Sequence, residues 1–229
     1  MLRLITDFDG PIMDVSERYY HVYCYCLKET QLPKQSIKQL SKSEFWDLKR
    51  AQVPEREIGV ISGLEEGQAK AFAHLRRRTV HQLPYLVHDR PIPVAIATLE
   101  KIQAANIDLA VMTMRRTAEL ESAFSQHDLW RFFPEDRRFC LSNDYVKTTD
   151  VEDKPLLMKQ AITQLPPADD IWMVGDTEAD IAAAKSQGIP FVAVLSGIRD
   201  RKQLAQHQPD FICDNLEQAL ALILKNKSD

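Results

Sequence analysis

The sequence predicts an α/β fold in which helices cover both faces of a parallel sheet. From about residue 93 onward, short apolar runs alternate with helical patterns, as they do when helices connect parallel strands. An earlier apolar run at Leu2–Ile5 is typical of a buried strand, and we expect it to join the same sheet. Residues 16–87 show helical periodicity without strand alternation, which predicts a small all-helical domain inserted after the first strand.

Local sequence breaks set the expected domain boundaries. We expect residues 1–15 and 88–229 to form the α/β core, and residues 16–87 to form the helical domain. The segment His88–Pro93 is polar and contains two prolines, which stiffen the backbone as in a linker. Ser16 is the expected N-cap of the first helix of the inserted domain.

Each further element has its own local pattern. Short apolar runs predict strands at 107–112, 138–141, 171–174, 191–195 and 211–212. Apolar residues at helical spacing predict core helices at 95–102, 117–127, 154–165, 178–187 and 216–224, and helices of the insert at 37–40, 45–51, 55–61 and 65–80. Pro166 and Gly188 end two of the core helices, because neither residue favours continuation of a helix.

Composition and charge favour a globular protein with a small-molecule partner. Of the 229 residues, 45% are hydrophobic and 27% are charged, and the formal net charge is −4. A net negative charge argues against nucleic acid as a partner. No apolar run approaches the roughly 20 residues that span a membrane, so we expect no membrane partner. The four scattered cysteines are not typical of a disulfide framework, which favours a reducing, cytoplasmic location.

Charged and polar side chains occur where predicted strands of the core end. Asp7 and Asp9 follow the first strand, Thr113 follows the second, and Asp176 follows a later one. The carboxyl ends of parallel strands share one edge of the sheet, which is where ligands bind in open α/β folds. Carboxylates at this edge are suitable ligands for Mg²⁺. A hydroxyl group and the ammonium group of Lys154 are suited to binding phosphoryl oxygens.

These residues resemble the four motifs of the haloacid dehalogenase-like (HAD) superfamily. Residues 7–10, Asp-Phe-Asp-Gly, match the first motif, and residues 111–113, Val-Met-Thr, match the second. Lys154 and Pro155 match the third, and residues 175–180, Gly-Asp-Thr-Glu-Ala-Asp, match the fourth. The resemblance implies a Rossmann-like, HAD-like core. The helical insert is similar to the C1-type cap of phosphoglycolate phosphatase and β-phosphoglucomutase relatives.

The resemblance also implies a Mg²⁺-dependent phosphatase that acts on a small phosphorylated metabolite. In such an enzyme Asp7 is the nucleophile that forms an aspartyl-phosphate, and Asp9 is the acid and base that moves protons. The implied metal ligands are Asp7, Asp9 through its backbone carbonyl, and Asp176. Thr113 is implied to donate a hydrogen bond to the phosphoryl group, and Lys154 to neutralise its charge.

Further residues are assigned supporting and substrate-binding roles. The resemblance implies that Asp180 orients Lys154 or a metal-bound water from outside the metal site. Lys49 and Arg50 are cations of the helical domain that follow two aromatic residues, and they are candidates for binding a small phosphorylated acid or sugar. Arg115 follows Thr113 closely and is a third candidate for substrate binding.

Several alternatives are open at this point. A phosphomutase of the β-phosphoglucomutase type shares every catalytic residue, and differs in whether the intermediate reacts with water or with a sugar hydroxyl. A phosphonatase, or a regulatory protein that keeps the fold without the catalysis, is a further alternative. Among single residues, Thr113 fits an ordinary strand position and Lys154 fits a solvated surface lysine. Both a monomer and a homodimer are compatible with the sequence.

Overall fold

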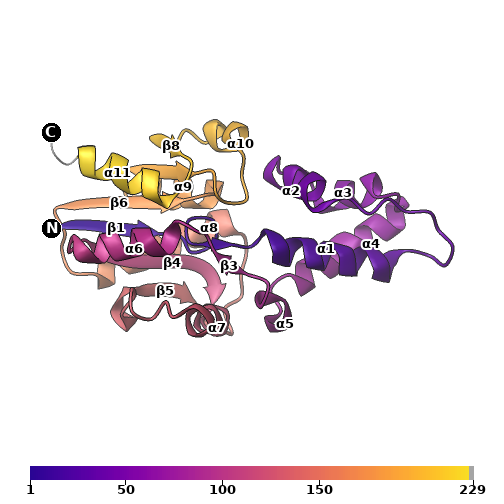
Figure 1. Cartoon of the computed structure of the whole chain (residues 1–229), viewed down its shortest axis with the longest axis horizontal. Helices are drawn as coiled ribbons and strands as arrows, with labels where there is room; N and C mark the ends of the chain where they lie inside the picture. The colour runs from indigo at the N-terminus through magenta and orange to yellow at the C-terminus, as the bar shows by residue number, and fades with distance from the viewer. Residues whose placement is uncertain (227–229) are drawn as a thin grey trace. The chain divides into compact units, whose positions relative to one another are not determined.

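A computed structural model of the chain describes residues 1–226 and divides into two compact units (Figure 1). One unit consists of Met1–Asp14 and the chain from Arg90 onward, and the other is Val15–Asp89. The first unit contains a short antiparallel ribbon in which Met13–Asp14 (β2) pairs with Arg90–Pro91 (β3). The chain therefore leaves and re-enters this unit through two segments that are hydrogen-bonded to each other.

The first unit is built on a parallel sheet whose central strand is the first of the chain. Within residues 1–226 the sheet has six strands, in the order β5–β4–β1–β6–β7–β8, and each neighbouring pair is parallel. The strands are Leu2–Thr6 (β1), Asp108–Arg116 (β4), Arg138–Leu141 (β5), Asp170–Gly175 (β6), Phe191–Val194 (β7) and Phe211–Cys213 (β8). Thr6 in β1 is level with Val111 in β4 and with Val174 in β6. The prediction that the first strand joins the later ones is confirmed.

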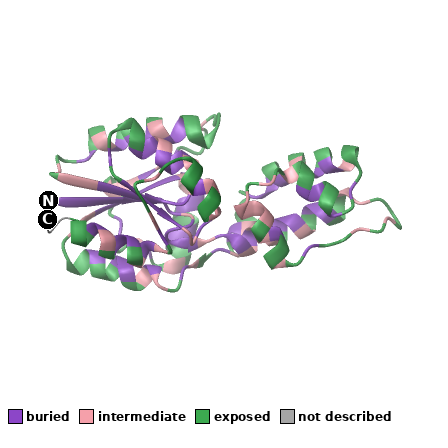
Figure 2. Cartoon of the chain, turned by 90° about the horizontal axis from the view of Figure 1, so that it is seen from above, coloured by how far each residue is buried: buried purple, intermediate pink, exposed green. Residues whose placement is uncertain are grey.

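Helices cover both faces of this sheet, and Figure 2 shows buried strands between helices with exposed outer sides. On one face Ala95–Ala104 (α6) packs beside Leu216–Asn226 (α11), and on the other Asp150–Gln164 (α8) packs beside Glu178–Ser186 (α9). Thr117–His127 (α7) packs against β4 and β5, Glu135–Arg137 forms a short 3₁₀ turn before β5, and Arg201–Gln206 (α10) follows β7. The α/β fold with helices on both faces is therefore as predicted.

The second unit is helical and has its own core. Its helices are Ser16–Thr30 (α1), Lys42–Arg50 (α2), Glu55–Ile61 (α3), Glu66–Thr79 (α4) and Leu83–Leu86 (α5). Tyr23 of α1 is fully buried; its ring stacks on Phe45 at 4.7 Å between centroids and meets Phe72 edge-on at 6.0 Å. These aromatic contacts join α1, α2 and α4 around a single apolar centre.

Two predictions about the helical unit are wrong. Residues 37–40 are not helical, because their backbone bonds elsewhere: Lys38 N–H donates to the Ser62 carbonyl at 2.9 Å, and Leu40 N–H donates to the Tyr23 hydroxyl at 2.9 Å. Ser16 is not the N-cap of α1 but its first helical residue, and Val15 occupies the cap position.

Two features of the first unit were not predicted from local pattern. Helix α8 begins at Asp150 and not at residue 154, because the Thr149 side chain accepts a hydrogen bond from Glu152 N–H and caps the helix. Helix α10 was not predicted; its cap is Asp200, whose side chain accepts a hydrogen bond from Gln203 N–H at 2.8 Å. Both helices start from a capping residue in a polar stretch, where apolar periodicity gives little signal.

Candidate active site

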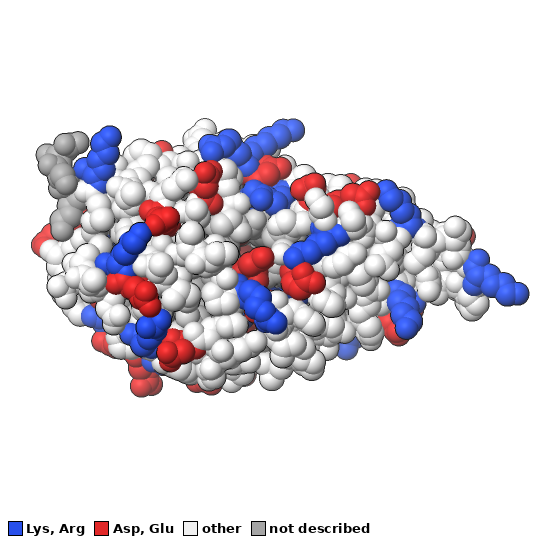
Figure 3. Space-filling model, in the orientation of Figure 1, with Lys and Arg blue, Asp and Glu red and all other residues white. Residues whose placement is uncertain are grey.

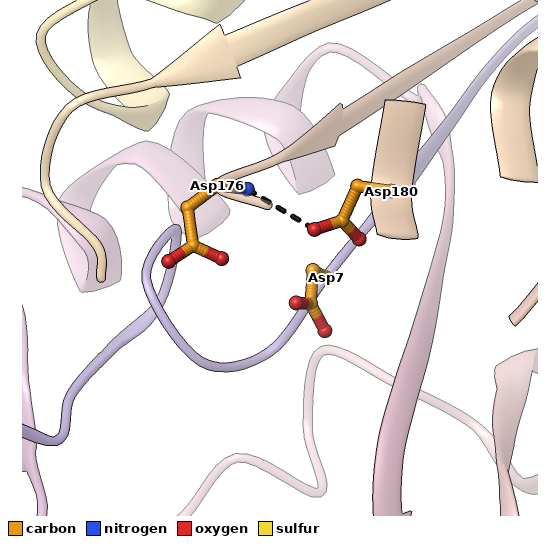
Figure 4. A group of neighbouring side chains, drawn as sticks. All are labelled: Asp7, Asp176 and Asp180. Carbon is orange, nitrogen blue, oxygen red and sulfur yellow. Dashed lines mark hydrogen bonds between the residues drawn. The ribbon is translucent and has the colours of Figure 1, made fainter. Parts of the chain in front are cut away.

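Three carboxylates meet at the carboxyl edge of the sheet (Figure 4). Asp7 follows β1, Asp176 follows β6, and Asp180 lies in the first turn of α9. One oxygen atom from each of the three groups lies within 4.8 Å of the other two. Their residues are 6%, 2% and 0% exposed, respectively. Because buried like charges repel strongly, the cluster needs positive partners.

Lys154 is one such partner. Its ammonium nitrogen lies 3.0 Å from Oδ2 of Asp7 and 2.5 Å from Oδ1 of Asp180. Lys154 lies in the second turn of α8 and is only 2% exposed, so its interpretation as a solvated surface lysine is wrong. Lys147, by contrast, pairs with Asp150 on the surface and is 32% exposed.

Asp180 is bound by protein groups through both of its oxygens. Oδ1 contacts Lys154, while Oδ2 accepts hydrogen bonds from the backbone N–H of Thr177 at 3.0 Å and from its hydroxyl at 2.6 Å. The N–H of Asp176 also points toward Oδ2, at 3.3 Å. Thr177 and Asp180 together form the capping box that begins α9. Asp180 therefore links the buried lysine to the turn that carries Asp176.

Asp176 is enclosed by backbone from two other turns. Its Oδ2 accepts a hydrogen bond from Ile198 N–H at 2.6 Å. A Cβ atom added at Gly10 would lie 2.3 Å from Cγ of Asp176, and one added at Gly197 would lie 1.8 Å from its Oδ2. Ser196 Oγ donates to the Gly10 carbonyl at 2.7 Å and ties the two turns together. Only glycine at these positions lets the backbone come this close to the carboxylate.

Thr113 and Asp9 are the other sequence-predicted residues of this unit, and a third residue connects them. Thr113 lies in β4 and is 2% exposed, and its Oγ1 accepts a hydrogen bond from Arg115 N–H at 3.2 Å. The guanidinium group of Arg115 binds the Asp9 carboxylate, with Nε and Nη2 at 2.9 Å and 2.7 Å from Oδ1. Arg115, a predicted substrate-binding residue, thus contacts the predicted acid and base.

Burial governs the electrostatics of the cluster. Burial raises the pKa of Asp7 well above its usual range; Lys154 opposes this rise, and the neighbouring carboxylates add to it. Burial, followed by the charge of Asp180, raises the pKa of Asp176 to about 7, although the Ile198 N–H opposes the rise. Burial alone would lower the pKa of Lys154, but the charges of Asp180 and Asp7 outweigh it and the net shift is upward.

The donor set is compatible with a divalent cation. Its side-chain oxygens come from three buried carboxylates, the ligands that hard cations prefer. Burial first, and the neighbouring carboxylates second, raise the pKa values of Asp7 and Asp176, so a further positive charge would favour their ionised forms. Asp7 and Asp176 are the better placed ligands, since Asp180 already binds Lys154 and the α9 cap.

The cationic candidates Lys49 and Arg50 lie in the helical unit, at the end of α2. Lys49 pairs with Glu55 of α3, and Arg76 of α4 binds the same Glu55 oxygen, Oε1, at 2.6 Å. Arg76 also lies over the ring of Tyr19, 4.7 Å from its centroid. Through Glu55, Lys49 and Arg76 thus join α2, α3 and α4, and Lys49 is largely buried.

Sequence reasoning missed the loop after β7. Besides Ser196, Gly197 and Ile198, this loop contains Arg199, whose Nε and Nη2 each lie 2.8 Å from a different carboxylate oxygen of Glu178. A glycine directly after a buried strand at the ligand-binding edge was the available signal, because such glycines often allow a close backbone approach.

Charged side chains of both signs lie on the surface of the described residues (Figure 3). On the face shown in Figure 3, basic and acidic side chains are interspersed, and the residues drawn there form no extended basic patch. None of the helices in residues 1–226 has the length and apolar character needed to span a membrane.

Comparison with known proteins points to one superfamily. A HAD-hydrolase-like family model matches residues 153–219, which include Lys154, Asp176 and Asp180. The phosphoglycolate phosphatase of Vibrio vulnificus (strain CMCP6) is 26% identical over 155 residues, which are 67% of this chain and 63% of that protein. The probable phosphatase IndB of Dickeya dadantii is 23% identical over 223 residues, 95% of this chain and 91% of that protein. The chain thus spans less than two thirds of the length of the phosphoglycolate phosphatases that it matches.

Solved structures share the fold over nearly the whole chain. A haloacid dehalogenase-like family hydrolase from Streptococcus pneumoniae superposes with a TM-score of 0.69 at 20% identity, over 97% of this chain and 98% of that one. A predicted phosphatase from Clostridium acetobutylicum gives a TM-score of 0.70 at 18% identity, over 98% of both chains. The four motifs and these similarities agree: residues 153–219 match a HAD-hydrolase-like family model, and the chain is similar in sequence to phosphoglycolate phosphatases.

Proposed function

We propose that this protein is a Mg²⁺-dependent phosphatase that hydrolyses a small phosphorylated metabolite through an aspartyl-phosphate on Asp7. The contact of the buried Asp7 carboxylate with the Lys154 ammonium carries this proposal. Oδ1 of Asp7 accepts a hydrogen bond from Phe8 N–H at 2.7 Å, so the side chain is held from both of its oxygens. A carboxylate fixed in this way, beside a cation that can bind a phosphoryl oxygen, is arranged as a nucleophile. The similarity to phosphoglycolate phosphatases supports this class of reaction.

The other residues of the sheet edge take complementary roles. The Lys154 ammonium and the Thr113 hydroxyl bind phosphoryl oxygens and disperse the charge that develops on them. Asp9 gives a proton to the leaving alcohol and later takes one from the attacking water. Asp180 keeps Lys154 in place through their 2.5 Å contact.

Asp7, Asp176 and the backbone carbonyl of Asp9 would hold the metal. Mg²⁺, when bound, supplies the positive charge that offsets repulsion between the Asp7 carboxylate and a phosphate group. The backbone of Gly10, Gly197 and Ile198 fixes the Asp176 carboxylate before any ligand arrives.

Phosphate release from p-nitrophenyl phosphate tests the proposal. We expect turnover in Mg²⁺ that is lost in excess EDTA and restored when Mg²⁺ is added back. A panel of phosphorylated metabolites, assayed under the same conditions, then ranks substrates by kcat/KM. Absence of Mg²⁺-dependent turnover on the aryl phosphate and on the whole panel would show that the proposed function is wrong.

The stability of the metal-free protein is expected to respond to pH through Asp176. The pKa of Asp176 is about 7 in the folded protein, against an ordinary value of 3.8. Between these two pH values the folded state therefore keeps a proton that the unfolded state has released. The contribution of Asp176 to the unfolding free energy is therefore fully present below about pH 4 and is lost as the pH rises to about 7. We expect the Mg²⁺-induced rise in Tm to be larger at pH 8 than at pH 5, because Mg²⁺ binds the ionised carboxylate.

Asp176→Asn provides the control for this effect. The amide cannot titrate, so the difference in unfolding free energy between the variant and the metal-free wild type should grow as the pH rises from 5 to 8. Urea unfolding in EDTA at both pH values measures that difference. A constant difference would contradict the assignment.

A further inference from the structure

The pair of Arg115 and Asp9 combines a buried cation with an accessible acid. The side chain of Arg115 is 1% exposed, whereas that of Asp9 is 25% exposed. Nε and Nη2 of Arg115 both contact the same oxygen, Oδ1 of Asp9, at 2.9 Å and 2.7 Å. Two donors from one rigid guanidinium plane fix the direction of a carboxylate more tightly than a single donor does.

The guanidinium group is itself held by its surroundings. It lies over the ring of Phe8, with Cζ 4.9 Å from the ring centroid, and Phe8 is fully buried. The backbone N–H of Arg115 donates to Thr113 Oγ1 at 3.2 Å, within the same strand, β4. Arg115 therefore connects the strand that carries Thr113 to the turn that carries Asp9.

We propose that Arg115 is a positioning residue, which holds the Asp9 carboxyl group in the direction needed for proton transfer during phosphate-ester hydrolysis. The proposal rests on the proposed function. In the first step an Asp7 oxygen bonds to phosphorus, the bond from phosphorus to the leaving oxygen breaks, and the Asp9 proton passes to that oxygen. In the second step water oxygen bonds to phosphorus, its proton passes to Asp9, and the bond to Asp7 breaks. Both side chains return to their starting states.

This role differs measurably from binding the substrate directly. An arginine that binds the phosphoryl group or the rest of the substrate helps all substrates with the same recognised groups alike. An arginine that directs the Asp9 proton helps only when the leaving oxygen needs a proton, which depends on the pKa of the leaving alcohol. Leaving groups of different acidity therefore separate the two roles.

The experiment compares kcat/KM for phenyl phosphate and 2,4-dinitrophenyl phosphate in wild type, Arg115→Ala and Arg115→Lys. This constant reports the steps up to release of the first alcohol, so later hydrolysis of the aspartyl-phosphate does not enter it. For Arg115→Ala we expect a loss of about 10- to 100-fold with phenyl phosphate, part of what a general acid contributes. With dinitrophenyl phosphate, whose leaving group needs no proton, the loss should stay within about 3-fold.

Arg115→Lys and two further variants make the result specific. Arg115→Lys keeps the charge without the planar pair of donors, and should lose activity with phenyl phosphate by less than Arg115→Ala does. In an Asp9→Asn background, Arg115→Ala should cause no further loss with phenyl phosphate, since no proton remains to be directed. Arg131→Ala, which removes a half-exposed arginine paired with Glu100, should leave both substrates unaffected.

The outcomes separate this proposal from the proposed function. An equal loss with both substrates, or no loss with either, would overturn the positioning role while leaving the phosphatase activity intact. If Arg115→Ala does not fold, the same comparison on Arg115→Lys decides, because it must show the same dependence on the leaving group. Absence of turnover by the wild type overturns the proposed function instead.

Discussion

Asp7→Asn is expected to abolish phosphate release and at the same time to stabilise the metal-free protein. Loss of the attacking carboxylate should lower kcat by a factor on the order of 10⁴ or more, as for other enzymes that lose their nucleophile. The amide resembles the protonated acid that burial favours, as the raised pKa of Asp7 shows. Removing a carboxylate whose ionised form burial disfavours should raise the unfolding free energy of the metal-free protein.

Steady-state kinetics in Mg²⁺ and urea unfolding in EDTA at pH 7.5 measure the two effects. Asp128→Asn is a matched control, because Asp128 is 83% exposed and has a left-handed backbone that asparagine tolerates. That variant should change neither activity nor stability. Residual turnover of Asp7→Asn near the wild-type rate would rule out Asp7 as the nucleophile, and a lower stability would mean that Asp7 is held mainly by its contact with Lys154.

Lys154→Met, unlike Asp7→Asn, is expected to destabilise the folded protein, and it should also greatly reduce activity. The substitution keeps an unbranched side chain in the buried site but leaves Asp7 and Asp180 facing each other without the ammonium group. Removing one member of a buried ion pair typically costs about 3–5 kcal/mol, and we expect a loss in that range. Activity should fall by at least about 10²-fold, because a fixed cation at the phosphoryl group is also lost.

Lys147→Met provides the control for the third motif. Lys147 lies seven positions before Lys154 in the sequence, but it is partly exposed and pairs with Asp150 on the surface. Its loss should change stability by less than about 1 kcal/mol. Adding Asp180→Asn to Lys154→Met should recover part of the stability without recovering activity. If Asp180→Asn restored no stability, repulsion between Asp7 and Asp180 would not be the cause of the destabilisation by Lys154→Met.

The part of the site that could be predicted consists of residues at the ends of apolar strands. Asp7 and Asp176 follow strands whose apolar runs are visible in the sequence, and the rule for parallel sheets brings such ends together. Lys154 could be selected only through its motif, since a lysine in a polar stretch carries no local sign of burial. The structure shows that Lys154 is buried: it is 2% exposed, and its ammonium group contacts the carboxylates of Asp7 and Asp180.

The remaining features depend on tertiary contacts that no local pattern encodes. The pairing of Arg115 with Asp9 joins residues 106 positions apart. The closeness of Gly197 to Asp176 likewise depends on how the β7 loop packs. Residues 37–40 have a helical pattern but find hydrogen-bond partners in distant residues, among them Tyr23, which override local propensity.

The central position of β1 has a consequence for synthesis of the chain. Strand β1, which precedes Asp7, leaves the ribosome before its partners, which are residues 108–111 of β4 and 170–174 of β6. At ordinary translation rates these follow β1 on the order of ten seconds later. During that interval an apolar strand has both edges unpaired, whereas Val15–Asp89 can already bury its own core. Early folding of the helical insert would therefore precede pairing of β1 with β4 and β6, and limited proteolysis of ribosome-bound chains of increasing length would report the order.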